Sequence, residues 1–265
     1  RVVERRGVSG DGTSIACFLD GSGPALVMVH GMTFDHTTAW SRLAPLLRDR
    51  FELCTIDRRG RGASGDGPEY SFEREIEDVL AVVGSFDGPV TLFGHSFGAT
   101  IAMEAAPLLA DLQALVLYEP SISSFDPWPQ GSIGRLEQFL ATGERGELLR
   151  SFFCDVMGLD SRTFGALRAM PSWPARVESA HTIPREARAD EEYVFDPGRF
   201  VSLRVPTLVI AGSESPVGFG PAAKAVHEAI PNSRLAVLEG QGHDAALTAP
   251  AVLAETIQSF METLE

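Results

Sequence analysis

The sequence has 265 residues and a mass of 28.5 kDa, long enough to bury one sizeable core. Lys and Arg number 22 against 36 Asp and Glu, a net charge of −14, and this excess repels phosphate backbones and anionic lipid. We therefore expect neither nucleic acid nor a membrane surface as a partner. No apolar run approaches the roughly 18 residues of a membrane-spanning helix, and charges interrupt any signal-peptide core near position 1. Three cysteines without CxxC spacing favour a reducing, cytoplasmic compartment over disulfides or a zinc site.

The order of predicted elements indicates an α/β fold. The chain opens with a predicted hairpin, in which residues 2–8 and 13–19 flank the turn Ser9-Gly10-Asp11-Gly12. Short, continuous apolar runs follow, as expected of strands covered on both faces in a parallel sheet, at 25–29, 53–56, 90–93, 114–118, 205–211 and 235–238. Stretches with helical apolar spacing lie between them, within 40–47, 76–83, 101–109 and 252–260. This alternation predicts a βαβ sheet with right-handed crossovers.

One segment breaks the alternation. Residues 122–203 contain no convincing buried strand, but they contain helical pieces and six prolines. We interpret them as a helical cap inserted between two strands, above the strand ends where open α/β sheets hold ligands. The predicted organisation is a core formed by 1–121 and 204–265, with 122–203 as the cap.

The motif that indicates chemistry is Gly94-His95-Ser96-Phe97-Gly98, a G-x-S-x-G sequence between a predicted strand and a predicted helix. The turn is so tight that a Cβ at either glycine would collide with neighbouring backbone. Ser96 is expected to adopt strained backbone angles that present its Oγ at a helix N-terminus, where developing negative charge is favoured. This context predicts a nucleophilic serine.

Two further loops can complete such a site. The sequence Val29-His30-Gly31-Met32 ends a predicted strand, and the N–H groups of Met32 and Phe97 are the expected oxyanion hole, with His30 in a structural role. His243 follows the last predicted strand in Gly240-Gln241-Gly242-His243, and a neutral imidazole there can act as general base toward Ser96.

Together with the segment Asp57-Arg58-Arg59-Gly60-Arg61-Gly62-Ala63-Ser64, which is similar to a D-x-R-G-x-G-x-S turn, these motifs resemble the α/β-hydrolase superfamily along nearly the whole chain. The resemblance implies a mostly parallel eight-stranded sheet with helices on both faces, a helical cap, no cofactor or metal, and a Ser–His–acid triad. A serine at the nucleophile position argues against haloalkane dehalogenases and epoxide hydrolases, which use a carboxylate there.

The triad acid departs from the family pattern. The usual position is the loop after the strand at 205–211, where Ser215 occupies the expected acid position and Glu214 lies one residue earlier. Glu119, at the end of the strand at 114–118, is the other candidate. Either carboxylate could accept the Nδ1–H of His243, and the choice between them stays open at the level of sequence.

The resulting functional hypothesis is a serine hydrolase that cleaves a carboxylic ester or thioester of a small to medium, largely apolar molecule. The alternatives are C–C bond hydrolysis, perhydrolysis or a lyase-type step on the same scaffold, or a non-catalytic ligand receptor. Some aromatic residues of the cap are expected to face the cleft, and a cationic cleft formed by Arg185, Arg188 and Arg199 is a further possibility. The sequence leaves the natural substrate and the oligomeric state open.

Overall fold

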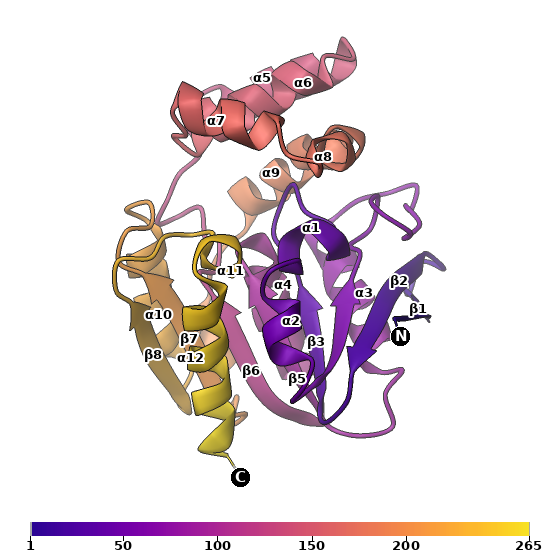
Figure 1. Ribbon diagram of the computed structural model, residues 1–265, viewed down its shortest axis with the longest axis vertical. Helices are drawn as coiled ribbons and strands as arrows, with labels where there is room; N and C mark the ends of the chain where they lie inside the picture. Colours follow the sequence, from indigo (N-terminus) through magenta and orange to yellow (C-terminus); the bar gives the residue numbers. More distant parts are fainter. Residues whose placement is uncertain (1, 265) are drawn as a thin grey trace.

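A computed structural model describes residues 2–264 of the chain and contains one eight-stranded sheet (Figure 1). The strands occur in the order β1-β2-β4-β3-β5-β6-β7-β8, and only the β1–β2 and β2–β4 pairs are antiparallel. Their bounds are β1 Val3–Val8, β2 Ser14–Gly21, β3 Ala25–Val29, β4 Glu52–Ile56, β5 Val90–His95, β6 Leu112–Tyr118, β7 Thr207–Gly212 and β8 Ser233–Leu238. The predicted strands all form, and the apolar runs of β3, β4, β5, β6 and β7 make the centre of the sheet.

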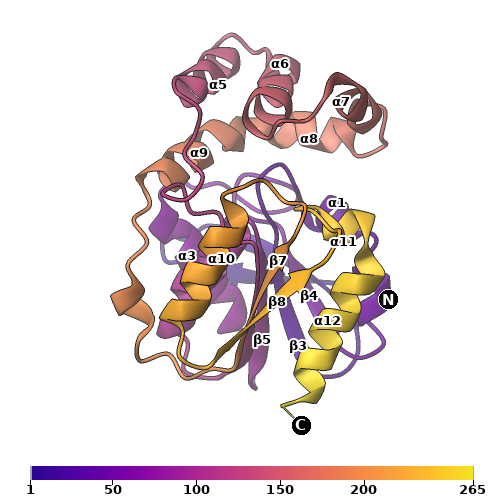
Figure 2. The same ribbon diagram turned by 90° about the vertical axis from the view of Figure 1, so that its left-hand side faces the viewer.

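Helices cover both faces of the sheet (Figures 1 and 2). On one face lie α3 (Phe72–Val83), α4 (Phe97–Ala105) and α10 (Phe219–Ala229), with the short 3-10 turn η1 (Ala106–Leu108) after α4. On the other lie α1 (His36–Trp40), α2 (Ala44–Leu47), α11 (Ala245–Thr248) and α12 (Pro250–Glu262). The helical spacing over 40–47 becomes two short helices rather than one.

One prediction about the sheet is wrong. The run at 235–238 is predicted to be covered on both faces, yet β8 is one of the two edge strands, with Leu235 37% and Val237 49% exposed. An edge strand has only one neighbouring strand, so the helices that flank the sheet cover it incompletely. Apolar composition alone does not distinguish such a strand from a central one.

Between β6 and β7 the chain forms a separate helical layer over one end of the sheet (Figures 1 and 2). Its elements are α5 Ser132–Ala141, α6 Arg145–Arg150, the π-helical turn η2 Ser151–Val156, α7 Ser161–Arg168, α8 Trp173–Ser179, η3 Ala180–Thr182, α9 Ile183–Glu192 and η4 Pro197–Phe200. The side chains of Leu136, Leu148 and Ile183 are buried in the same apolar cluster as α3 and α4. We call these elements the cap.

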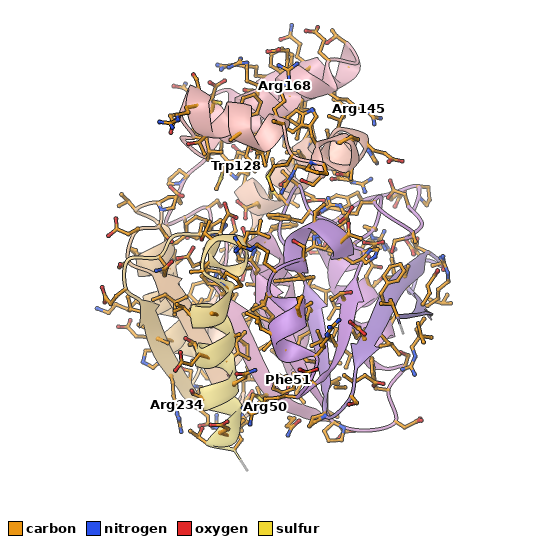
Figure 3. All side chains as sticks on the ribbon, in the orientation of Figure 1. Arg50, Phe51, Trp128, Arg145, Arg168 and Arg234 are labelled. Carbon is orange, nitrogen blue, oxygen red and sulfur yellow. The ribbon has the colours of Figure 1, made fainter. Side chains whose placement is uncertain are left out.

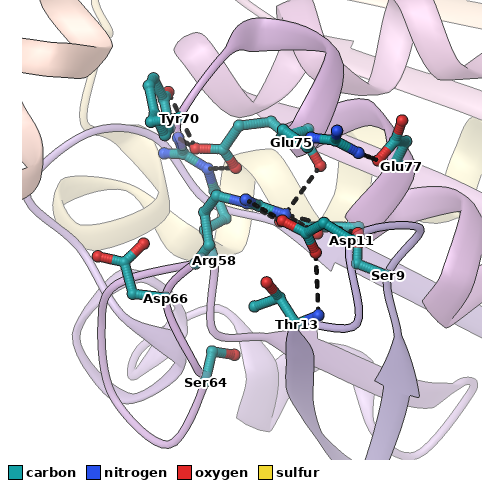
Figure 4. Close-up of polar contacts among 12 residues, drawn as sticks. Ser9, Asp11, Thr13, Arg58, Ser64, Asp66, Tyr70, Glu75 and Glu77 are labelled. Carbon is teal, nitrogen blue, oxygen red and sulfur yellow. Dashed lines mark hydrogen bonds and ion pairs between the residues drawn. The ribbon is translucent and has the colours of Figure 1, made fainter. Parts of the chain in front are cut away.

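A buried ion network joins the turn after β4 to the cap, and Figure 4 shows its part around Arg58, Tyr70 and Glu75. Arg58 contacts Glu75 of α3 at 2.6 Å and Glu186 of α9 at 3.3 Å, while Arg61 also pairs with Glu186. Tyr70 donates a hydrogen bond to Glu75. Burial opposes the charge of Arg58, but the two glutamates outweigh it and raise the pKa of Arg58 above its ordinary value. These contacts position α9, and with it the cap, over the core.

Candidate active site

Ser96 lies at a sharp turn between β5 and α4. Its backbone has φ 58° and ψ −128°, a left-handed conformation that is rare for residues other than glycine. A Cβ at Gly94 would lie 2.5 Å from the Ala99 Cα, and one at Gly98 would lie 2.4 Å from the carbonyl oxygen of His30. The predicted steric role of both glycines is therefore seen directly, and the turn presents the Ser96 side chain at the N-terminus of α4.

Three side chains from distant segments form a hydrogen-bonded line. The Ser96 hydroxyl lies 3.0 Å from His243 Nε2, and His243 Nδ1 lies 2.6 Å from Oε2 of Glu119. With the ring proton on Nδ1, facing the carboxylate, Nε2 is free to accept the hydrogen bond from Ser96. This arrangement has the geometry of a nucleophile, a base and an orienting acid.

The structure separates the two acid candidates. Glu119 is fully buried at the end of β6, with φ 48°, and its second oxygen accepts the Gly212 N–H at 2.6 Å. Glu214 is exposed, and its side chain makes no hydrogen bond or ion pair with any residue between 2 and 264. Of the two carboxylates, Glu119, at the end of the strand that adjoins β5, is the one that contacts His243.

The surroundings of Glu119 favour its charged form. Burial raises the pKa of the carboxyl, but His243, the Ser215 hydroxyl and the Gly212 N–H together lower it below the ordinary value. The Ser215 Oγ is buried, and no residue between 2 and 264 forms a hydrogen bond with it in normal geometry. Ser215, at the usual acid position, thus lies beside the Glu119 carboxylate.

The loop that carries His243 is held by residues that the sequence analysis did not single out. His95 donates from Nε2 to the His243 carbonyl at 2.9 Å, and the Tyr118 hydroxyl donates to the Gly242 carbonyl. Phe219 stacks on the His243 ring with centroids 4.1 Å apart. Burial, reinforced by His243, lowers the pKa of His95 to about 4, so His95 remains neutral. The only sequence signal for these roles is that His95 and Tyr118 directly precede Ser96 and Glu119.

The loop after β3 packs on Ser96. A Cβ at Gly31 would lie 2.9 Å from the Ser96 Cβ, so only glycine lets the loop approach this closely. The N–H groups of Met32 and Phe97 donate no hydrogen bond to another residue in the described part of the chain. Neither N–H group is therefore committed to an acceptor among these residues. His30 is buried and bonds to the Gly31 carbonyl and the Arg58 N–H, away from the Ser96–His243 pair.

A cavity of about 930 Å³ opens above Ser96 and His243, between the core and the cap. Trp128, which lies between the two layers in Figure 3, lines it. Most of the other lining side chains are apolar, among them Met32, Phe34, Phe152, Phe153 and Leu167. The cavity thus suits an organic molecule with few polar groups.

The polar lining differs from the sequence expectation. Arg185, Arg188 and Arg199, proposed as a cationic cleft, line a different cavity of about 760 Å³ and pair with carboxylates of Asp66, Glu137 and Glu104, respectively. The arginines that line the cavity above Ser96 are Arg42 of the core and Arg176 of the cap. Asp190 of α9 also lines it, accepts a hydrogen bond from Trp128, and has a pKa raised to about 6 by burial.

Within residues 2–264 there is no cluster of three or more His, Cys, Asp or Glu side chains that could hold a metal ion. Cys17, Cys54 and Cys154 are all free thiols. None of the helices in this part of the chain is long and apolar enough to cross a bilayer.

A model of the alpha/beta hydrolase family matches residues 26–256. The chain belongs to the alpha/beta hydrolase family. This confirms the resemblance drawn from the sequence motifs and the predicted fold, a mostly parallel eight-stranded sheet flanked by helices.

Family members with known structures or named activities are similar over most of their length. An alpha/beta hydrolase from Sphaerobacter thermophilus is 34% identical, with a TM-score of 0.85 over 97% of this chain and 100% of that chain. N-formylmaleamate deformylase from Pseudomonas putida is 29% identical over 84% of this chain and 83% of the relative. Pimeloyl-[acyl-carrier protein] methyl ester esterase from Nitrosomonas europaea is 26% identical, covering 87% and 92% of the two chains. This chain is similar to hydrolases of differing specificity.

Proposed function

We propose that this alpha/beta hydrolase is a serine hydrolase that cleaves carboxylic esters or thioesters through an acyl-enzyme. The observation that carries the proposal is the line of hydrogen bonds from Ser96 to His243 to Glu119 at the wall of a largely apolar cavity. The named activities of two relatives, a deformylase and a methyl ester esterase, support a hydrolytic reaction.

In the first half of the proposed reaction, His243 Nε2 takes the proton of the Ser96 hydroxyl as Oγ forms a bond to the carbonyl carbon. The carbonyl oxygen becomes an oxyanion, which accepts hydrogen bonds from the Met32 and Phe97 N–H groups. One such donor typically contributes about 3–4 kcal/mol to the transition state. Collapse of the intermediate breaks the bond to the leaving alcohol or thiol, which takes the proton from His243.

In the second half, water donates a proton to His243 and its oxygen attacks the acyl carbon. The bond to Ser96 Oγ then breaks, Oγ regains the proton, and a carboxylic acid leaves. Glu119 remains ionised throughout, holds the His243 proton on Nδ1 and stabilises the imidazolium formed in each half. His243 and the Gly212 N–H favour the charged form of Glu119.

The test compares two variants, Ser96→Ala and Ser172→Ala. Ser172 is the control, because it lines the same cavity without contacting His243. Ser96→Ala is expected to lower kcat for 4-nitrophenyl acetate by at least about 10⁴-fold, while Ser172→Ala stays near the wild type. A fluorophosphonate should label wild-type Ser96, as mass spectrometry of the digest would show. Unlabelled Ser96 with no ester turnover would refute the esterase and leave a ligand receptor. Turnover of a β-diketone without turnover of esters would instead indicate C–C bond hydrolysis.

A further inference from the structure

Arg176 is a buried cation in the roof of the cavity. It lies on α8, which sits directly above the region of α1 and the loop after β3 (Figures 1 and 2). Only 4% of its surface is exposed, and its guanidinium carbon lies 4.5 Å from the centre of the Phe34 ring and 5.8 Å from that of Phe153. Rings of this kind stabilise a guanidinium, but they do not satisfy its N–H groups.

The hydrogen bonds of Arg176 are incomplete. Nη1 donates to the Thr33 carbonyl at 3.1 Å and to the Thr33 hydroxyl at 2.8 Å. Nε is buried without a hydrogen-bond partner, and Nη2 donates to no residue between 2 and 264. A guanidinium carries five N–H donors, so three of them face no acceptor of the protein.

Arg176 also lacks a counter-charge. It forms no ion pair with any carboxylate in the described part of the chain, although a buried charge is costly unless it is paired. Burial lowers the pKa of Arg176, and Asp244 and Asp35 only partly offset this through space. Asp35 is already engaged with the Thr37 and Thr38 N–H groups, and Asp244 is exposed.

Arg176 lies in the same cavity as the proposed reacting groups. Thr33, which it binds, follows Met32 directly in the chain, and Met32 supplies one proposed oxyanion donor. Arg176, Met32, Ser96 and His243 all line the same cavity. A molecule whose carbonyl is held at Ser96 can therefore extend toward the unsatisfied donors of Arg176.

We propose that Arg176 binds a carboxylate on the acyl part of the substrate, so that the enzyme acts on half-esters of dicarboxylic acids. This inference rests on the proposed function. A carboxylate would accept the free N–H groups and supply the missing charge, and planar recognition of this kind is what a guanidinium does better than an ammonium. The apolar walls would contact the carbon chain that joins the two carbonyl groups.

Other charged groups that line the cavity do not provide this site. Arg42 is exposed and donates to the Leu247 carbonyl, and Asp126 and Asp244 are exposed acids. Asp190 is held by Trp128, and as an acid it would repel a carboxylate. Arg176 is thus the one buried cation of this lining among residues 2–264.

The rival explanation is that Arg176 only positions the loop at Thr33, which has φ 65°. The two roles differ in one measurable respect. Loss of a positioning residue lowers turnover of every ester equally, whereas loss of a carboxylate-binding residue lowers turnover only of the ester that carries the second charge. A pair of substrates matched in shape separates the two roles.

The experiment measures kcat/KM by pH-stat for monomethyl glutarate and for methyl 5-methylhexanoate, in which an isopropyl group replaces the carboxylate. Wild-type enzyme should prefer the charged ester. Arg176→Gln should lower kcat/KM for that ester by about 10- to 100-fold, the usual worth of a hydrogen bond to a charged group. It should change turnover of the neutral ester by less than about 3-fold, while Arg176→Lys keeps part of the preference. Arg42→Gln, the matched control for an exposed arginine of the same lining, should leave the preference intact.

A second arm measures binding without turnover. Calorimetry with Ser96→Ala should show tighter binding of monomethyl glutarate than of the neutral ester, and Arg176→Gln in that background should remove the difference. A wild-type enzyme without preference for the charged ester, or equal losses on both esters, would overturn the assignment while the esterase stands. Hydrolysis of neither ester, with unlabelled Ser96, would refute the proposed function, and the binding arm alone would then decide about Arg176.

Discussion

Replacement of Glu119 by glutamine tests which carboxylate orients His243. When His243 takes the Ser96 proton, the ring becomes an imidazolium beside the Glu119 carboxylate, with Nδ1 and Oε2 at 2.6 Å. Two unit charges centred about 4 Å apart attract by about 4 kcal/mol at an effective dielectric constant of 20. Since 1.36 kcal/mol corresponds to tenfold in rate, loss of this attraction should lower kcat by about 10³-fold.

The structure adds a second effect to this loss. The Gly212 N–H donates to the other oxygen of Glu119 at 2.6 Å, so the oxygen of a glutamine amide should turn toward Gly212. Its NH₂ group would then face His243 Nδ1, which would have to become the unprotonated nitrogen. With the ring proton on Nε2, His243 could not accept the Ser96 proton. The fall in kcat should therefore be at least as large as the charge alone predicts.

The assay is the steady-state hydrolysis of 4-nitrophenyl acetate, with circular dichroism to confirm that each variant is folded. Glu214→Gln is the matched control, because Glu214 is exposed and lies in the loop after β7. It should change kcat by less than about 2-fold, as substitutions at exposed sites usually do. Retention of more than a tenth of wild-type kcat by Glu119→Gln, or an equal loss in both variants, would refute the assignment of the acid.

Three further predictions concern the site and its support. Adding Ser215→Asp to Glu119→Gln should raise kcat by at least about tenfold, because a carboxylate beside residue 119 restores part of the negative charge next to His243. No recovery of kcat would show that the side chain at residue 215 cannot reach the His243 ring. Burial raises the pKa of Asp190 to about 6, so the folded state binds a proton at this carboxyl more tightly than the unfolded state does. The contribution of Asp190 to the free energy of unfolding should therefore fall as pH rises from about 4 to 6. Asp190→Asn should remove this dependence and gain up to about 3 kcal/mol at pH 7.5, measured by urea denaturation at several pH values; an unchanged pH profile would contradict it. Glu186→Gln removes the carboxylate that pairs with two buried arginines, and it should lower the free energy of unfolding by about 3–5 kcal/mol. Glu137→Gln breaks only an exposed pair and should cost at most about 1 kcal/mol in the same assay, and equal losses would argue against the buried network.

Much of the fold follows from features that are local in the sequence. Strands and helices each have a characteristic spacing of apolar residues that is recognisable within a short stretch of sequence. Each strand predicted in this way is present. The turn at Ser96 is recognised from a local motif, and the tight contact at Gly94 is also local, with Ala99. The tight contact at Gly98 is with His30, which follows the adjoining strand. Local signals fail at β8, where exposure depends on the strand's place at the edge of the sheet.

The sequence by itself determined the α/β architecture, the strained serine and the histidine that follows the last strand. The choice of Glu119 over Glu214 as the partner of His243 came from the tertiary structure, because it depends on strand order and on a left-handed backbone at residue 119. The same holds for Arg176, which stands out only when α8 is folded over the core and its donors are found without acceptors. Spacing along the chain carries no information about which side chains from distant segments meet, since packing of the whole domain sets those contacts.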